Sequence, residues 1–224
     1  MIGQSGATRR AGEGTRVKIC GLTRPADAEY AACQGADALG VVFAPGPRRL
    51  DVVRAAEVLA AVPAAVQRVG VFADHGLEFI HEALERCRLD WVQLHGHEAA
   101  ELAAAVPARV IKAVRVASAA DLERARDYPA DAFLLDAPAA NGRLGGTGET
   151  FDWSEAERLP WPRDKVIVAG GLSVESVGAA IERLRPGGVD VSSGVESAPG
   201  VKDHGLIAAF IAAVCEADAG IRLR

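Results

Sequence analysis

The stretch that decides the fold is an apolar run followed by two glycines, Val166-Ile167-Val168-Ala169-Gly170-Gly171-Leu172-Ser173. Its first four residues are apolar without alternation, as expected of a strand that is buried on both faces of a parallel sheet. The two glycines end the strand, and a stretch of helix-forming residues follows them. The segment therefore predicts a strand, a tight turn and a helix, which together make one βα unit.

The same pattern recurs along the whole chain, where short β-branched runs alternate with Ala-rich helical stretches. The predicted strands are Val17–Cys20, Ala38–Phe43, Gln67–Phe72, Trp91–Leu94, Val110–Val114, Ala132–Asp136, Val166–Ala169 and Val189–Val191. The predicted helices include Asp51–Ala61, Leu77–Arg88, Glu98–Ala105, Ala119–Arg126, Val174–Leu184 and Gly205–Ala217.

Such a series of βα units forms either an open doubly wound sheet or a closed barrel. The number of units and the lack of a G-x-G-x-x-G turn after the first strand favour closure. We therefore predict an α/β protein with a single (β/α)₈ TIM barrel over residues 16–224. Residues 1–15 have no periodicity and are rich in Gly, Ser, Thr and Arg, which predicts a disordered extension.

Composition excludes several classes of function. A net charge of −5 and a pI near 5.6 provide no basic surface for nucleic acid. The apolar runs, such as Ala208–Cys215, are shorter than the ~20 residues of a membrane span, and no apolar stretch of a secretory signal follows Arg9 and Arg10. The four cysteines have neither CxxC nor zinc-site spacing. We therefore expect a cytoplasmic protein without disulfides or a metal, bound to neither nucleic acid nor membrane.

Candidate chemistry lies at the strand ends, because the C-terminal rim of such a barrel carries the active site. Cys20 ends the first strand, and it is either a small buried hydrophobe or a general base. Lys18 shares its face of the strand, and a nearby ammonium would favour the thiolate. Strands one and eight are neighbours in a closed barrel. We therefore also predict an ion pair between Lys18 and Asp190, since an isolated buried charge is costly.

The sixth strand ends at Asp136, which is either a cap for the next segment or a general acid whose pKa is raised by burial. Gln93 and His95 end the fourth strand and offer polar recognition groups. Arg48 and Arg49, at the rim of the second strand, offer a guanidinium to a carboxylate, although a solvated surface pair is the alternative.

Glycines follow the last two strands. Gly170 and Gly171 precede a helix, and Ser193 and Gly194 follow the eighth strand. Because glycine lets the backbone approach an anion and helix N-termini present free N–H groups, these turns predict a phosphate site rather than ordinary turns. The long connection Ala137–Thr150 contains Gly145-Gly146-Thr147-Gly148, which is either a binding loop or a flexible segment.

These segments together carry the motifs of a known family. The motifs are Val17-Lys18-Ile19-Cys20-Gly21-Leu22-Thr23, Gly35–Gly40, Gly70-Val71-Phe72, Val92–Glu98, Gly145–Gly148 with Phe151-Asp152-Trp153, Ala169–Leu172, Asp190–Glu196 and Gly200–Asp203. In order and spacing the chain resembles phosphoribosylanthranilate isomerase of tryptophan biosynthesis, from Val17 to the C-terminus.

The resemblance implies a (β/α)₈ barrel that isomerises N-(5-phosphoribosyl)anthranilate to 1-(2-carboxyphenylamino)-1-deoxyribulose 5-phosphate. This is an Amadori rearrangement without a cofactor and the third step from chorismate. The resemblance implies that Asp136 protonates the ribose ring oxygen and that Cys20 removes the proton at C2. Its expected ligand is a phosphosugar, and members of the family are monomers or homodimers. The expected substrate-binding residues are Arg49, Gln93, His95, Gly146 and Asp190, and the expected phosphate-binding residues are Gly170, Gly171, Ser193 and Gly194.

Two departures from the family pattern bear on these expectations. Pro47-Arg48-Arg49 stands where Ser-Pro-Arg is common, so Arg48 remains an alternative to Arg49 as the carboxylate ligand. Ser176 stands where the family has an asparagine.

Three other functions would require different residues at these positions. A bifunctional isomerase that also accepts a histidine-pathway substrate would have an aspartate in place of Cys20. Indole-glycerol-phosphate synthase would have lysines at strand ends and a longer N-terminal extension. A catalytically silent, ligand-binding barrel would lack Cys20 or Asp136.

Overall fold

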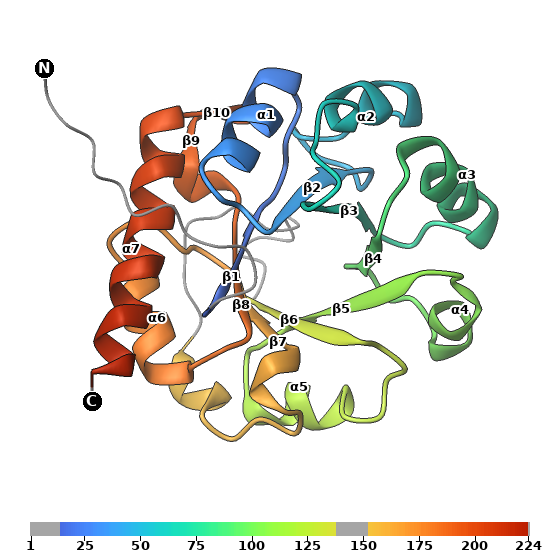
Figure 1. Cartoon of the computed structure of the whole chain (residues 1–224). Helices are drawn as coiled ribbons and strands as arrows, with labels where there is room; N and C mark the ends of the chain where they lie inside the picture. Colours follow the sequence, from blue (N-terminus) through green and yellow to red (C-terminus); the bar gives the residue numbers. More distant parts are fainter. Residues whose placement is uncertain (1–13, 138–151, 224) are drawn as a thin grey trace, which may run out of the picture.

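The computed structural model describes residues 14–137 and 152–223, and its centre is a closed barrel of eight parallel strands (Figure 1). Each strand pairs with the next along the chain, and β8 closes the barrel on β1, with Lys18 opposite Asp190. The strands are β1 (Arg16–Ile19), β2 (Ala38–Val42), β3 (Gln67–Phe72), β4 (Trp91–Leu94), β5 (Arg109–Arg115), β6 (Ala132–Asp136), β7 (Val166–Val168) and β8 (Gly188–Val191). The predicted (β/α)₈ barrel is confirmed.

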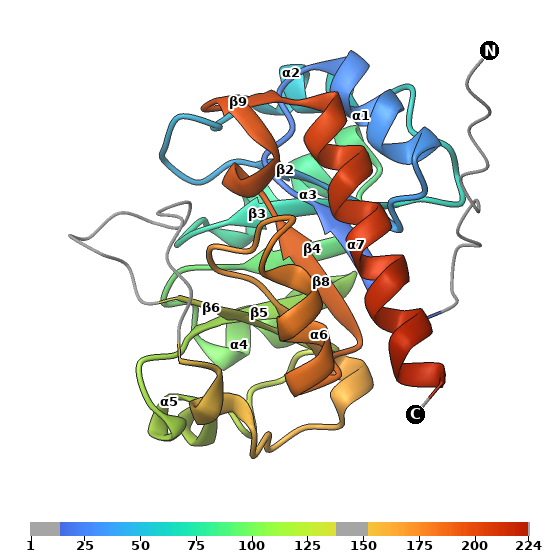
Figure 2. The ribbon, with the colours of Figure 1, turned by 90° about the vertical axis from the view of Figure 1, so that its left-hand side faces the viewer.

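Helices cover the outside of the barrel (Figures 1 and 2). They are α1 (Pro25–Cys33), α2 (Val52–Leu59), α3 (Leu77–Cys87), α4 (Ala100–Ala105), α5 (Ala119–Arg124), α6 (Val177–Leu184) and α7 (His204–Arg222). Shorter elements are the 3₁₀ turns η2 (Trp153–Ala156), η3 (Arg163–Lys165) and η4 (Ser193–Val195), and the antiparallel pair β9 (Glu196–Ala198) and β10 (Val201–Lys202).

Most strands and helices differ from the sequence-based expectation by a few residues at their ends, and two segments need separate comment. Helix α6 begins at Val177 rather than at Val174, because the backbone N–H of Ser173 donates to the Ser176 hydroxyl (2.9 Å) in a turn that precedes the helix. Residues 1–13 of the expected extension lie outside the described residues. Thr15, however, is buried, and its N–H and hydroxyl donate to the Asp218 carboxylate of α7 at 2.8 and 2.7 Å.

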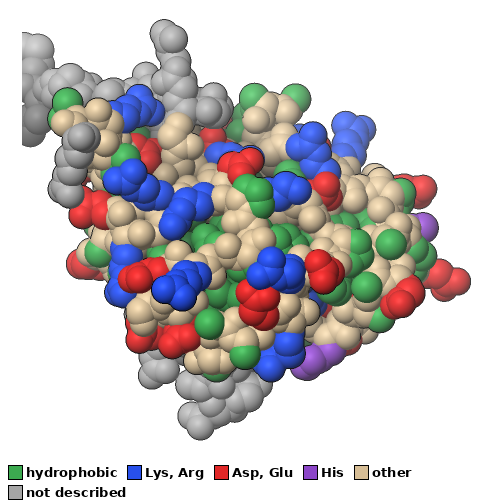
Figure 3. Space-filling view, turned by 90° about the horizontal axis from the view of Figure 1, so that it is seen from below, with side chains coloured by type: hydrophobic (Ala, Val, Ile, Leu, Met, Phe, Trp, Pro, Cys, Tyr) green, Lys and Arg blue, Asp and Glu red, His purple; other side chains and the backbone are tan. Residues whose placement is uncertain are grey.

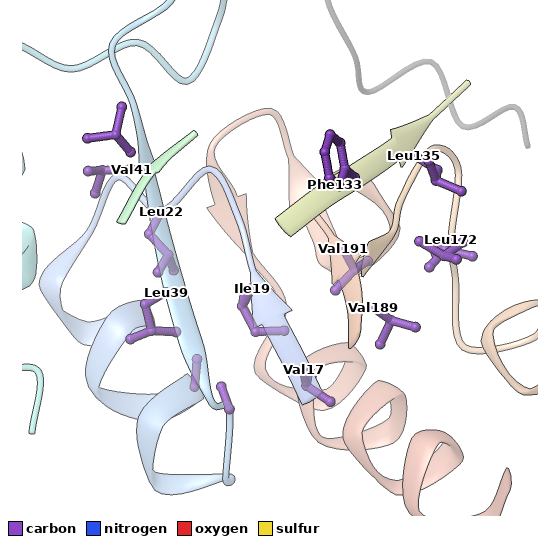
Figure 4. Close-up of a cluster of buried hydrophobic side chains, with 14 of the residues drawn as sticks. Val17, Ile19, Leu22, Leu39, Val41, Phe133, Leu135, Leu172, Val189 and Val191 are labelled. Carbon is purple, nitrogen blue, oxygen red and sulfur yellow. The ribbon is translucent and has the colours of Figure 1, made fainter. Parts of the chain in front are cut away.

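The alternation of side chains along the strands divides the core in two. Outward-facing residues such as Val17 and Ile19 of β1 and Val189 and Val191 of β8 pack under the helices (Figure 4). A separate cluster, which we assign to the barrel lumen, contains Val69, Ile111, Ala113, Ala132, Leu134 and Ala169. Full burial of a Val or Ile side chain stabilises a fold by ~1.5–3 kcal/mol, so both clusters favour the closed barrel. The alternation also places Lys18 and Cys20 on the lumen side of β1.

Helix α7 is long and apolar enough to cross a membrane by length and composition alone, contrary to the expectation from its shorter apolar runs. In the structure it packs against α6 and α1 at the side of the barrel (Figure 2). Ile207, Phe210, Ile211 and Val214 form its buried face. The buried apolar side chains of α7 therefore help to cover the side of the barrel.

Acidic and basic side chains lie interspersed on the face shown in Figure 3. Exposed pairs on single helices include Arg54 with Glu57 and Arg86 with Glu82, at 2.6 and 2.9 Å. Pairs of this kind stabilise a helix by only ~0.3–0.5 kcal/mol, so they contribute little to the fold. The ion pairs that matter for the site are buried.

Candidate active site

A cavity opens at the C-terminal ends of the strands, where the barrel fold places active sites. Cys20, Gln93, His95, Asp136 and Asp190 all line it. The loops that follow β2, β7 and β8 complete its wall, through Arg48, Gly170, Gly171, Leu172, Ser192 and Ser193. Residues far apart in the sequence thus meet in one place, because each follows or ends a different strand.

Cys20 follows β1 and lies beside Lys18. A methyl group built on Gly40 of β2 would come within 3.0 Å of Cys20 Sγ and 3.3 Å of Lys18 Cε, so both side chains pack over this glycine. Lys18 Nζ donates to Asp190 Oδ1 at 2.9 Å, and both residues are more than nine-tenths buried. The predicted ion pair between Lys18 and Asp190 is confirmed.

Charge and burial act on Cys20 in opposite directions. Burial raises the pKa of the Cys20 thiol, the Lys18 ammonium works against that rise, and the Asp190 carboxylate adds to it. Burial also disfavours the charged form of Lys18, but Asp190 and then Cys20 more than offset it, so the pKa of Lys18 is raised. Lys18 is therefore a cation positioned to stabilise a thiolate at Cys20.

Asp136 ends β6 and is 6 % exposed. Its Oδ1 accepts a hydrogen bond from the Ala137 N–H at 2.9 Å, and its Oδ2 lies 3.1 Å from His95 Nε2. His95 Nδ1 in turn lies 3.0 Å from Gln93 Nε2. Three residues that the sequence analysis treated separately thus form a single hydrogen-bonded chain.

The two glycines after β7 have left-handed backbone conformations, with φ of 73° at Gly170 and 63° at Gly171. Both line the cavity together with Ser193, whereas Gly194 is not among the lining residues. A methyl group on Gly194 would collide with the carbonyl oxygen of Leu172. Gly194 therefore lets the loop after β8 approach the loop after β7, and the approach brings Ser193 next to the double-glycine turn.

Arg48 and Arg49 point to different surroundings. Arg48 lines the cavity, and its Nε and Nη2 donate to Glu196 at 2.8 and 2.6 Å. Arg49 is exposed and is not part of the cavity wall. The structure thus places Arg48 in the cavity wall, and the expected role of Arg49 as a substrate ligand stays a prediction. The difference arises because the turn at Gly46 and the pairing with Glu196 decide which guanidinium turns inward.

Sequence reasoning missed Glu196 and Lys202 as the groups that hold Arg48. Lys202 Nζ donates to Glu196 at 2.8 Å and to the Ser192 carbonyl at 2.9 Å. Burial opposes ionisation of Glu196, but hydrogen bonds from Arg48 and Lys202 outweigh it and lower the pKa of Glu196. Burial lowers the pKa of Lys202, against its pairing with Glu196. Both residues belong to the C-terminal motifs quoted above, which were the available signal. Gly146 lies outside the described residues.

Comparison with known proteins gives the same family on both sequence and structure. A family model described as N-(5'phosphoribosyl)anthranilate (PRA) isomerase matches residues 17–213. The N-(5'-phosphoribosyl)anthranilate isomerase of Geotalea daltonii is 47% identical over 198 residues, which are 88% of this chain and 95% of that protein.

Two solved structures are also similar. Phosphoribosyl anthranilate isomerase from Thermotoga maritima superposes with a TM-score of 0.82 at 41% identity, over 90% of this chain and 99% of that one. Another phosphoribosyl anthranilate isomerase, solved in complex with reduced 1-(o-carboxyphenylamino)-1-deoxyribulose 5-phosphate, has a TM-score of 0.79 at 40% identity, over the same shares of the two chains.

Proposed function

The chain belongs to the N-(5'-phosphoribosyl)anthranilate isomerase family of tryptophan biosynthesis, and we propose that it acts by an acid–base Amadori rearrangement with Asp136 as acid and Cys20 as base. The protein is an isomerase. The product is 1-(2-carboxyphenylamino)-1-deoxyribulose 5-phosphate, and the reaction is the third step from chorismate. The observation that carries the mechanism is that Cys20 and Asp136, from β1 and β6, line one cavity together with the double-glycine turn.

The reaction needs one proton delivered and one removed. Asp136 transfers a proton to the ribose ring oxygen, the bond from C1 to that oxygen breaks, and the anthranilate nitrogen forms a Schiff base with C1. The Cys20 thiolate then removes the proton from C2, which gives an enolamine. The enolamine loses its hydroxyl proton and gains one at C1, which gives the ketone. The sum is an isomerisation, and no cofactor or metal enters it.

The double-glycine turn is the proposed anchor for the phosphate. The backbone at Gly170 and Gly171, and Ser193 at the start of η4, face the cavity and offer N–H groups to an anion. Gly194 supports this anchor from behind by allowing the two loops to touch. With the phosphate there, the ribose extends toward Cys20 and Asp136.

The anthranilate carboxylate is assigned to Arg48 in preference to Arg49. Glu196 occupies Nε and Nη2 of Arg48, whereas Nη1 makes no hydrogen bond within the described part of the chain. A guanidinium with one edge held by a carboxylate keeps its remaining N–H groups for a second anion.

Asp190 uses Oδ1 for Lys18, and its second oxygen is the proposed acceptor for a sugar hydroxyl. Gln93, His95 and Gly146 complete the proposed substrate site.

Three further assignments accompany the function. We place the enzyme in the cytoplasm, in keeping with cysteines that have no CxxC spacing. The barrel domain begins at about residue 16, and residues 1–15 are an extension that precedes it. The enzyme works as a monomer or a homodimer on a phosphosugar ligand.

The test is a fluorescence assay in which phosphoribosylanthranilate is generated in situ and its disappearance is followed after addition of the full chain. Turnover is expected, and inorganic phosphate should compete with the substrate through the turns at Gly171 and Ser193. Well-folded protein without turnover, but with phosphate-competed binding of the substrate, would instead identify a ligand-binding barrel.

A further inference from the structure

The hydrogen-bonded chain from Gln93 to Asp136 couples the orientation of the Gln93 amide to the position of the hydrogen on His95. Gln93 is 1 % exposed, and its Nε2 is 3.0 Å from His95 Nδ1, while His95 Nε2 is 3.1 Å from Asp136 Oδ2. A neutral imidazole has one donor and one acceptor nitrogen. Because an amide nitrogen only donates, Nδ1 accepts and Nε2 carries the hydrogen that is given to Asp136.

Both oxygens of Asp136 are hydrogen-bonded in this arrangement. Its Oδ2 accepts from His95, and its Oδ1 accepts from the Ala137 N–H at 2.9 Å. The acid of the reaction must nevertheless carry a proton when the ring opens. In the described part of the chain, His95 is the titratable side chain that is hydrogen-bonded to Asp136, and it is therefore the proton source that the geometry offers.

The amide of Gln93 carries a second signal. Its Oε1 is buried and has no hydrogen-bond partner in the described part of the chain. An unpaired buried acceptor is costly, about 1–3 kcal/mol. Half a turn of the amide would bring Oε1 to the position beside His95 Nδ1, where it could accept a hydrogen. A hydrogen on Nδ1 is what His95 has when Nε2 accepts from a protonated Asp136. Each orientation of the amide therefore matches one position of the proton.

We propose that Gln93 and His95 are positioning residues that load the proton onto Asp136, in an inference that rests on the proposed isomerisation. His95 takes a proton from solvent and becomes imidazolium. Its Nε2 proton passes to Asp136 Oδ2, and Asp136 gives a proton to the ring oxygen as the C1–O bond breaks. His95 is left neutral with its hydrogen on Nδ1, donated to Gln93 Oε1, and a proton from solvent at Nε2 then gives the imidazolium that begins the next turnover. One proton enters through Asp136, and one leaves through Cys20 when its thiol returns the C2 proton to solvent.

The backbone around His95 is held by charged side chains outside the relay. Arg115 Nη2 donates to the His95 carbonyl at 3.0 Å. Lys112 Nζ donates to the Gly96 carbonyl at 2.8 Å, and Glu98 accepts from the Gly96 N–H at 3.0 Å. A side chain that passes a proton must keep its distance from both partners, and these anchors fix the base of the imidazole.

The charged groups around the relay come from every neighbouring element. They are Asp74 after β3, Glu98 after β4, Lys112 and Arg115 on β5, Asp136 on β6 and, across the cavity, Cys20, Asp190 and Arg48. Within the described part of the chain, Asp136 is the one of these groups that is hydrogen-bonded to the imidazole of His95.

The closing experiment compares His95→Gln with His97→Gln. The glutamine at 95 retains a donor nitrogen near Asp136 but cannot take up a proton. His97 is a matched control, because its side chain is 84% exposed and it does not line the cavity. His95→Gln should lower kcat by about 100-fold with KM changed by less than about threefold, which is the size of a lost proton-transfer contribution. His97→Gln should behave as wild type.

The pH dependence of kcat separates proton transfer from mere support. In His95→Gln the proton is held by a carboxyl group alone, and the ordinary pKa of a carboxyl group is about 4. The pH above which kcat falls, because the acid has lost its proton, should therefore decrease by more than about one unit. Gln93→Glu places a negatively charged acceptor beside Nδ1, which favours the imidazolium form of His95. In this variant kcat should therefore begin to fall only at a higher pH than in the wild type.

The outcomes are distinct. Folding of each variant is checked by thermal unfolding. The pH profile of either variant that folds tests the relay, because the two variants are expected to shift the profile in opposite directions. Absence of turnover by the wild type overturns the proposed function and the relay together. Turnover by the wild type with an unmoved pH profile in His95→Gln, or with a downward shift in Gln93→Glu, overturns the relay alone.

Discussion

The two sides of the active-site cavity support their reacting groups by different means. On the β1 and β8 side, Cys20 lies beside a buried ion pair, Lys18 with Asp190. On the β4 and β6 side, Asp136 ends a chain of hydrogen bonds through His95. The difference reflects what each group must do. A buried thiol acts as a base more readily when a cation stabilises its anion, and in the proposed relay His95 supplies Asp136 with its proton.

The largest expected effect comes from removing the base. Cys20→Ser should lower kcat by about 1,000- to 10,000-fold, because a serine hydroxyl does not ionise near neutral pH. The exposed cysteine at the end of α1 supplies the control, and Cys33→Ser should leave the rate unchanged. Steady-state fluorescence kinetics measure both. Near-normal turnover by Cys20→Ser would remove this residue from the mechanism.

Removing the acid should cost somewhat less. Asp136→Asn keeps an acceptor for His95 but cannot deliver a proton, so kcat should fall by about 100- to 1,000-fold with little change in KM. The double variant of Cys20→Ser and Asp136→Asn tests whether both act on one reaction. A loss in the double variant equal to that of Cys20→Ser alone would be expected of groups that work as a unit. A large rise in KM with unchanged kcat would instead assign Asp136 to binding.

The ionic side of the comparison is tested by Lys18→Met. Burial raises the pKa of Cys20 and Lys18 opposes that rise, so without the ammonium the thiolate should form only at still higher pH. The rate at which iodoacetamide alkylates Cys20, followed by mass spectrometry against pH, should shift to higher pH by about one unit or more, and kcat at neutral pH should fall at least about tenfold.

A control is needed because Lys18→Met leaves the charge of Asp190 buried and unpaired, at a cost of about 3–5 kcal/mol in the free energy of unfolding. Adding Asp190→Asn should restore part of the stability in urea unfolding without restoring Lys18 as a cation beside Cys20. An alkylation profile that stays at the wild-type pH in Lys18→Met would contradict the role of the ion pair.

The smallest expected effect separates the two arginines. Arg48→Ala should raise KM by about tenfold or more, in keeping with ~1.5–3 kcal/mol for a hydrogen bond to a charged group. Arg49→Ala should change KM by less than about twofold, because an exposed charge is largely screened. Measuring KM for both variants under the same conditions shows which arginine binds the anthranilate carboxylate. A larger rise in KM for Arg49→Ala than for Arg48→Ala would assign the carboxylate to Arg49.

Much of the site's location was predictable from the sequence, but the contacts between its members were not. Cys20, Asp136 and the double-glycine turn each follow an apolar strand, so placing the strands also placed these groups at the rim. The pairing of Lys18 with Asp190 followed from barrel closure and the need to neutralise a buried charge. The link from His95 to Asp136 carried no local signal, because it joins residues on β4 and β6 through space.

The strand–helix order follows from the sequence alone, and β3, β4 and β6 have the predicted bounds, because strand formation depends on apolar and β-branched residues that are neighbours in the chain. The folded barrel, by contrast, is needed to show that Arg48 lines the cavity and that Glu196 and Lys202 hold it, and also that α6 begins after a further turn. The direction of a loop side chain depends on partners such as Glu196, which is 148 residues from Arg48. No local pattern encodes a contact of that separation, and it exists only once the barrel has closed.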